Sequence, residues 1–232
     1  IFGLYAAKYR NKQVDLVILA SEMMLNLWLE RRGGILPKTP VVFYDIDSKH
    51  LDGRQFPPDV TGTSDTVDLL QSIKWILRAR PAVNEIVVVH GVGQADREFI
   101  QSATALKKEL GGQVRFTDFS GLSLAEIKRR VERLPSSSVV LYGLTFEDAA
   151  SVKYRPIDAL RELTATSAVP VISGYDQFIG TGTIGGYMYS IDAQARTAAQ
   201  IGLRILRGEV TSAMPIVQKQ SNRFIFDHLA LQ

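Results

Sequence analysis

The sequence contains no cysteine, which excludes a disulfide framework, a thiolate metal site and a cysteine nucleophile. Its three histidines, His50, His90 and His228, share no metal-ligand spacing, and neither G-x-S-x-G nor H-E-x-x-H occurs. No apolar run approaches the roughly 18 residues of a membrane span, and the chain opens at Ile1 without a recognisable signal peptide. We therefore predict no metal, no cofactor and no enzymatic activity.

The chain also lacks a segment dominated by charge of one sign. It has 27 basic and 24 acidic residues, a net charge of +3, and the two signs are mixed along the sequence. Even the basic run Lys128-Arg129-Arg130 is followed at once by Glu132. A nucleic-acid-binding protein usually carries a basic stripe, so we predict no nucleic-acid partner.

What is present is an alternation of short apolar runs with amphipathic stretches, in a chain that is 46% hydrophobic. Continuous β-branched runs between helices are typical of parallel strands that are buried on both faces. This pattern predicts an α/β fold of parallel sheets flanked by helices. The predicted strands are 14–20, 41–44, 86–89, 114–119, 139–142 and 169–172, with a further strand at 186–189. The predicted helices are 22–32, one capped by Ser64, 95–110, 123–134, 157–166 and 192–207.

Two glycine motifs resemble nucleotide-binding loops without their context. Gly180 to Gly185 matches G-x-G-x-x-G, but a loop precedes it and a strand is predicted after it, whereas the dinucleotide fingerprint opens a helix. His90 to Gly93 does lie between a strand and a helix, yet the third glycine position is held by Asp96, which would repel a phosphate. We expect neither motif to bind a nucleotide.

An acidic cluster follows the run 41–44 and consists of Asp45, Asp47, His50 and Asp52. A calcium loop alternates oxygen ligands and ends on a glutamate, and Lys49 lies where a ligand would be needed. A solvated loop at the mouth of a cleft is therefore the better interpretation.

Polar residues and glycines follow most of the predicted strands at their carboxyl ends. In open parallel sheets this edge binds ligands, although every connecting loop contains some turn residues. The segments concerned are Ser21–Glu22, Asp45–Asp47, Gly91–Gly93, Gly143–Thr145 and Gly174–Asp176.

Taken in order, several segments resemble the ABC-transporter substrate-binding proteins of the type I periplasmic-binding fold. They resemble even more the related sensor domains of bacterial membrane histidine kinases. The matching segments are 8–9 with 15–18, 40–43, 58–62, 139–142, 169–171, 180 with 185–187, 199–209, and the tail 222–227. The resemblance covers nearly the whole chain.

The resemblance implies two lobes that close on a small molecule. The first lobe would contain residues 1–62 and 186–208, and the second 63–185 and 209–232. The family usually opens with a strand, a helix and a second strand ahead of the helix that matches Leu4–Asn11. This sequence has no counterpart of those elements. Either the sequence is incomplete at its start or the first lobe is abbreviated, and in both cases part of the expected pocket is missing from this sequence.

The expected ligand contacts come from both lobes. An aspartate can hold an amine, because a buried carboxylate needs a partner, and a tyrosine offers an apolar ring with a polar tip. The ligand is therefore expected to be amine-bearing or aromatic. The predicted contact residues are Ser21, Glu22 and Asp45 in the first lobe, and Gly91, Tyr142, Thr145, Tyr175 and Asp176 in the second.

The leading hypothesis is an extracytoplasmic sensor domain of an inner-membrane signalling protein such as a histidine kinase, with a possible homodimer as its working form. The alternative is the solute-binding component of an ABC importer, with a permease as its partner. A third hypothesis is the effector domain of a cytosolic transcription regulator, which has the same fold.

Overall fold

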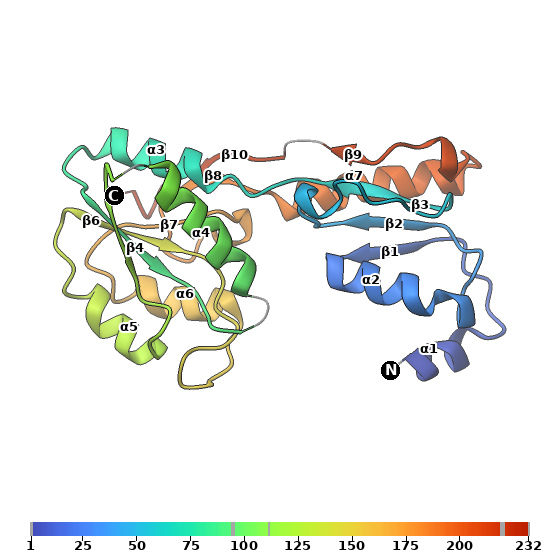
Figure 1. Cartoon of the computed structure of the whole chain (residues 1–232), viewed down its shortest axis with the longest axis horizontal. Coiled ribbons are helices and arrows are strands. Elements are labelled where there is room, and N and C mark those ends of the chain that lie inside the picture. Colours follow the sequence, from blue (N-terminus) through green and yellow to red (C-terminus); the bar gives the residue numbers. More distant parts are fainter. Residues whose placement is uncertain (1, 94–95, 111, 219–220, 232) are drawn as a thin grey trace. The chain divides into compact units, whose positions relative to one another are not determined.

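A computed structural model of the chain describes residues 2–93, 96–110, 112–218 and 221–231. They form two compact units, each built around its own sheet (Figure 1). Unit 1 comprises Ile1–Thr66 and Ser190–Ser221, and unit 2 comprises Val67–Tyr189 and Asn222–Gln232. The chain therefore passes from one unit to the other three times.

The sheet of unit 1 has four parallel strands in the order β1-β2-β3-β9. Their bounds are β1 Val17–Ala20, β2 Val41–Tyr44, β3 Val60–Ser64 and β9 Val217–Gln218. The unit also contains the helices α1 Phe2–Tyr9, α2 Glu22–Arg31 and α7 Ile191–Leu206. The side chains of β2 alternate between two apolar clusters: Phe43 packs in one with Trp28 of α2, and Val42 packs in the other with Ile201 of α7. One helix therefore covers each face of the sheet.

The sheet of unit 2 has six strands in the order β10-β8-β7-β6-β4-β5, and all pairs are parallel except β10 with β8. The strands are β4 Glu85–Val89, β5 Arg115–Asp118, β6 Ser138–Tyr142, β7 Val171–Ser173, β8 Gly185–Met188 and β10 Arg223–Phe226. The helices are α3 Leu69–Ala79, α4 Arg97–Glu109, α5 Leu124–Val131 and α6 Pro156–Thr164.

Every residue of the central strands β4 and β6 is buried, as expected for strands with helices on both faces. Val88 belongs to the cluster that contains Ile73 of α3 and Leu106 of α4, whereas Val87 belongs to the cluster that contains Ile127 of α5 and Leu160 of α6. Each side chain buried in this way contributes about 1.5–3 kcal/mol. The predicted α/β architecture of mostly parallel, helix-flanked sheets is confirmed.

The strand β3 was not predicted, because its sequence Val-Thr-Gly-Thr-Ser lacks an apolar run. Ser64, the predicted helix cap, is instead the last residue of this strand. The cap of α3 is Asp68, whose carboxylate accepts a hydrogen bond from Gln71 N. Gly62 is needed inside the strand because a Cβ there would overlap the carbonyl oxygen of Phe43 in β2.

The division of the C-terminal segment also differs from the sequence-based expectation, which assigned residues 209–232 to the second lobe. Residues 209–221 belong to unit 1, because β9 pairs with β3. The hydroxyl of Thr61 donates to Met214 O and that of Thr63 to Val217 O, which fixes this segment along β3.

Two helix boundaries follow their predicted signals. The side chain of Ser123 accepts a hydrogen bond from Glu126 N at the start of α5, and Gly208, with φ of 96°, follows the end of α7. None of the helices in the described residues has the length and apolar character needed to cross a bilayer.

Candidate functional site

Two loops at the carboxyl edge of the unit 2 sheet are joined by main-chain hydrogen bonds. The loop after β4 donates from Gly91 N to Leu144 O at 2.7 Å and from Val92 N to Glu147 O at 2.8 Å, both in the loop after β6. Gly91, a predicted ligand contact, is buried at this junction. A Cβ there would collide with the carboxylate of Asp96 and lie 2.7 Å from Glu147 O. The absence of a side chain at Gly91 therefore allows the two loops to approach each other closely.

Asp96 lies between these loops and is fully buried. Its carboxylate accepts hydrogen bonds from Gly93 N at 3.0 Å and Phe146 N at 3.4 Å. Burial raises the pKa of Asp96 above its usual value. A nucleotide phosphate would need the amide groups of this loop, and Asp96 already occupies that of Gly93. The structure thus gives a physical reason why His90–Gly93 does not act as a phosphate loop.

The loop after β6 is organised by Asp148, which is 2% exposed. Its carboxylate accepts hydrogen bonds from Ala150 N and Val152 N within the loop, from Leu124 N at the start of α5 and from the Tyr154 hydroxyl. Burial acts to raise the pKa of Asp148, but these hydrogen bonds outweigh burial and lower it. One carboxylate therefore fixes the shape of the loop.

This ordered loop presents apolar side chains to solvent. Phe146 is 42% exposed and Val152 is 47% exposed, and Val92 of the neighbouring loop is 43% exposed. Exposed apolar side chains at the carboxyl edge of a parallel sheet are suited to contact an apolar ligand. None of the three was predicted as a contact residue, because a phenylalanine or valine in a sequence is first expected in the core.

Tyr175 and Asp176 follow β7, the strand next to β6 in the sheet. The Tyr175 ring is partly buried and makes edge-on contacts with Phe178 and Tyr189, with ring centroids 6.0 and 6.2 Å apart. The Asp176 side chain is partly exposed. Among the described residues, nothing forms a hydrogen bond or ion pair with its carboxylate, although its main-chain N–H donates to Tyr189 O.

Tyr142 and Thr145, also predicted to contact a ligand, are both fully buried. The Tyr142 hydroxyl donates to Pro156 O at 2.7 Å, and burial raises the pKa of this phenol far above its usual value. The ring packs edge-on against Phe178 at 5.6 Å. In the described conformation both residues belong to the support beneath the edge loops, and whether they touch a ligand stays a prediction.

The carboxyl edge of unit 1 carries backbone strain. Ser21 follows β1 with φ of 75° and ψ of 152°, and Asp45 follows β2 with φ of 59°. Positive φ is uncommon outside glycine, and the Ser21 conformation costs about 1–3 kcal/mol. Ser21 N donates to Tyr44 O, which joins the ends of the two strands. Asp45 is partly exposed and has an interaction partner.

The charge of Glu22, the remaining predicted contact, is already paired. One carboxylate oxygen lies 2.6 Å from His50 Nδ1 and the other 3.7 Å from a guanidinium nitrogen of Arg54. The neighbouring Met23 and Met24 are 71% and 38% exposed. The edge of unit 1 therefore presents apolar surface beside a carboxylate that already has partners within the unit.

The acidic cluster of unit 1 has structural roles. Asp47 accepts hydrogen bonds from Lys49 N, as the cap of a short helical turn, and from the Thr66 hydroxyl. His50 is paired with Glu22. Within the part of the chain that the structure describes, there is no group of three potential metal ligands.

The motif Gly180–Gly185 has the geometry of a turn. Gly180, Gly182 and Gly185 have φ of 83°, 93° and 102°, and the residues that follow form the strand β8. Because no helix begins after it, the motif lacks the N-terminus that would bind a pyrophosphate. The interpretation as a connecting loop is confirmed.

Comparison with solved structures supports the fold. A ligand-free, open substrate-binding protein with adhesive properties from Clostridium difficile matches with a TM-score of 0.69 and 15% identity, over 99% of this chain and 76% of that one. An ABC domain in complex with L-Trp from Streptococcus pneumoniae matches with a TM-score of 0.64 and 12% identity, over 99% and 78%. A conserved domain protein from Vibrio cholerae O1 biovar El Tor matches with a TM-score of 0.65 and 14% identity, over 99% of this chain and 77% of that one.

At these identities the structural matches establish a shared fold and nothing more. A search among curated proteins finds no match to this sequence. The family described as ABC transporter substrate binding protein matches residues 36–232, which is most of the chain. Members of such a family typically bind solutes and are not catalysts. The chain therefore belongs to the ABC transporter substrate-binding protein family.

Proposed function

We propose that this chain is the solute-binding component of an ABC importer, and that its solute combines an amine or other cation with an aromatic or apolar group. The observation that carries the proposal is the carboxylate of Asp176, which has no partner among the described residues. It follows Tyr175, which could stack against an aromatic solute. A carboxylate that loses water when a ligand binds needs a positive partner.

The surroundings of Asp176 support the same ligand class. The neighbouring loop after β6 carries exposed Phe146 and Val152, and adjacent parallel strands place their following loops along one edge. The similar Streptococcus pneumoniae structure contains L-Trp, which has both an amine and an aromatic ring. We therefore assign the cation-binding role to Asp176 and the apolar contacts to Phe146, Val152 and Tyr175. Gly91, Tyr142 and Thr145 hold these loops in place, and Ser21, Glu22 and Asp45 form the corresponding edge of unit 1.

Family membership also supports a proposal about location and partner. The chain would work outside the cytoplasm and deliver its solute to a membrane permease. The sensor hypothesis rests on the resemblance of the tail 222–227. In the structure, residues 223–226 form β10, paired with β8, so this segment has a structural role that any protein of this fold could use. The family match and the three solved structures carry no link to a histidine kinase. Transport is therefore the better supported role.

The test is a thermal unfolding screen with matched ring compounds: L-Trp, tryptamine, which lacks the carboxylate, and indole-3-propionate, which lacks the amine. A ligand at about 100 times its dissociation constant stabilises the protein by about 2.7 kcal/mol. We expect L-Trp, tryptamine or a related aromatic amine to raise the unfolding midpoint by several degrees, and indole-3-propionate to leave it unchanged.

Two results would contradict the proposal. An equal shift with indole-3-propionate would mean that the amine is not recognised. A shift with sugars or dicarboxylates, and none with aromatic amines, would assign the edge of unit 2 to another solute class.

A further inference from the structure

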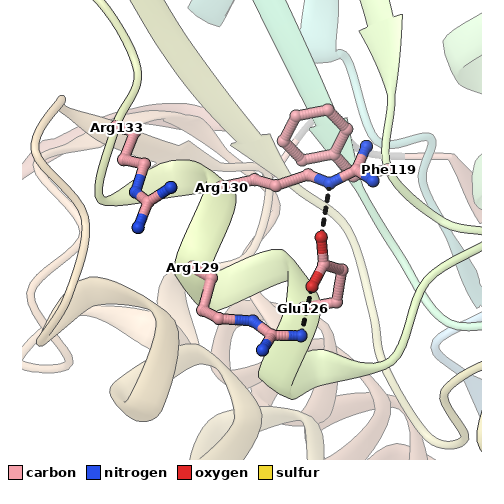
Figure 2. A pocket seen from close by; sticks show the side chains of 5 residues that line it. All are labelled: Phe119, Glu126, Arg129, Arg130 and Arg133. Atoms are coloured by element: carbon pink, nitrogen blue, oxygen red, sulfur yellow. Dashed lines mark hydrogen bonds and ion pairs between the residues drawn. The ribbon is translucent and has the colours of Figure 1, made fainter.

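A hollow of about 520 Å³ lies outside all the predicted ligand residues, on the surface of unit 2. Its lining residues are Phe119, Glu126, Arg129, Arg130 and Arg133 (Figure 2). All but Phe119 come from α5 and the turn that follows it. Three of the five side chains are guanidinium groups, and the hollow contains one carboxylate.

The single carboxylate is shared between two of the arginines. Arg130 Nε lies 2.9 Å from one oxygen of Glu126, and the Arg129 guanidinium donates to the other oxygen (Figure 2). The hydrogen bonds from Arg130 and Arg129 lower the pKa of Glu126, so the carboxylate is charged at neutral pH. Two positive charges therefore face one negative charge, and each guanidinium keeps N–H groups directed to solvent.

The third arginine has no such partner. Arg133 is exposed and, among the residues that the structure describes, nothing forms a hydrogen bond or ion pair with its guanidinium, although its main-chain N–H donates to Arg130 O. In Figure 2 its guanidinium lies apart from Glu126, and no dashed line joins the two. The hollow as a whole thus carries an excess of two positive charges within little more than two turns of helix.

Arg130 is held in place by an aromatic ring beneath it. Its guanidinium carbon lies 5.5 Å from the centre of the Phe119 ring, which is a cation–π distance. Phe119 is 8% exposed and belongs to the core of unit 2. Arg130 is therefore anchored by the ring and by Glu126 while its side chain stays 48% exposed, and Arg129 and Arg133 are exposed as well.

The segments that contain α5 and α6 carry a small excess of basic residues. Segments 124–134 and 155–164, which contain α5 and α6, hold six basic and four acidic residues, a net charge of +2 in a chain of net charge +3. Lys128 of α5 lies 2.9 Å from Glu162 of α6, which joins the two helices. In the sequence, the run 128–130 belongs to a pattern of mixed charge. The folded helix instead places Arg129, Arg130 and Arg133 around one hollow.

We propose that Arg129, Arg130 and Arg133 form a docking surface for an acidic segment of another protein. The guanidinium groups are spread along the helix and open to solvent, so that carboxylates at several points of an extended chain can each meet a different one. Arginine pairs with carboxylates through two parallel hydrogen bonds. Free phosphate would use only part of this surface.

The test measures binding of hexaglutamate to the whole chain by fluorescence anisotropy at low salt. We expect saturable binding that weakens as NaCl rises, because exposed charges are screened. The double variant Arg129→Gln/Arg133→Gln removes two exposed guanidinium groups and should weaken binding roughly tenfold. Its unfolding midpoint should stay close to that of the wild type.

The matched control is Lys107→Gln/Lys108→Gln, which removes the same charge from exposed positions at the end of α4. It should leave the affinity within about twofold of the wild type if the effect is local and not due to net charge. An equal loss in both double variants would overturn the proposal, as would no binding of hexaglutamate to the wild type.

Two further probes separate other occupants. Inorganic phosphate that competes with hexaglutamate at equal concentration would assign the hollow to a free anion. Vesicles of phosphatidylglycerol that bind more tightly than hexaglutamate, and that lose binding in the arginine variant, would assign it to a lipid surface. Either result would overturn the proposal of an acidic protein partner. None of these readouts depends on the solute-binding proposal.

Discussion

The carboxyl edges of the two sheets are built from similar elements but differ in the state of their charges. In unit 1, Glu22 is paired with His50 and Arg54, and the apolar surface beside it comes from methionines. In unit 2, the carboxylate of Asp176 has no partner among the described residues, and a loop fixed by Asp148 presents Phe146. A carboxylate that is already paired gains little from a further cation, whereas an unpaired carboxylate can bind one favourably. The comparison therefore assigns charge recognition to unit 2.

The difference extends to how each edge is held. In unit 2, four donors converge on the buried carboxylate of Asp148. In unit 1, the corresponding carboxylate, Asp47, is partly exposed and accepts from two donors. A buried carboxylate that satisfies several donors contributes more to stability than a partly exposed one. Rigid support in unit 2 fits a site that must hold a charged group in one geometry.

The largest expected effect is on the support of the unit 2 edge. Asp148→Ala should lower the free energy of unfolding by about 3 kcal/mol, because several buried donors lose their acceptor. Asp47→Ala in unit 1 should cost about 1 kcal/mol, since fewer and more exposed donors are involved. Urea unfolding of both variants measures the difference. Equal losses would break the comparison between the two edges.

Asp148 also predicts that the stability of the fold depends on pH. Because the pKa of Asp148 is lowered in the folded chain, its contribution is fully present above the pKa of an unfolded aspartate, about 3.9. That contribution is lost as pH falls through the folded value. Asp148→Asn should therefore be less stable than wild type at pH 7, with a gap that narrows below about pH 4. A gap that stayed constant down to pH 2.5 would contradict the assigned role.

A third prediction concerns the junction of the two loops in unit 2. Gly91→Ala places a methyl group against Asp96 and should cost about 1–3 kcal/mol, the usual penalty of overpacking. The control is Gly121→Ala in the same unit, where a Cβ would meet nothing within 4 Å. Thermal unfolding compares the two variants. A Gly91→Ala variant as stable as its control would show that the loops can separate without cost.

The smallest expected effect distinguishes two buried serines of unit 2. Ser173 is the last residue of β7, and its hydroxyl has no hydrogen-bond partner within the described part of the chain. Ser173→Ala should therefore leave stability unchanged or raise it by up to about 1 kcal/mol. Ser138→Ala removes a 2.7 Å hydrogen bond to Glu85 and should cost about 1–2 kcal/mol. The reverse order in urea unfolding would mean that Ser173 has a partner that matters to the fold.

The central strands could be predicted from the sequence because burial on both faces requires a continuous run of apolar residues. Ile86–Val89 and Val139–Tyr142 are continuous apolar runs, and both form strands. The strand β3 left no such trace, because the threonines of its Val-Thr-Gly-Thr-Ser sequence use their hydroxyls on residues more than 150 positions away. Contacts between segments that are distant in sequence cannot be read from local periodicity.

The same limit applies to the site. Asp176 could be predicted as a site residue because it follows a predicted strand. Its position at the carboxyl edge of the sheet depends only on where that strand ends in the sequence. That Glu22 is paired with His50 and Arg54 could not be predicted, because the pairing depends on how the loop after β2 folds back onto α2. The exposure of Phe146 was missed for a similar reason, because it depends on the shape of a loop that is fixed by four hydrogen bonds to Asp148.

The most direct test of the account compares Asp176→Asn with Glu22→Gln in calorimetric titrations with the aromatic amine that gives the largest thermal shift. Both variants remove one negative charge and keep the side-chain size. We predict that Asp176→Asn weakens binding by roughly tenfold or more, which corresponds to about 1.4 kcal/mol, and that Glu22→Gln changes affinity less than threefold. Equal losses, or a larger loss in Glu22→Gln, would contradict the assignment of charge recognition to unit 2.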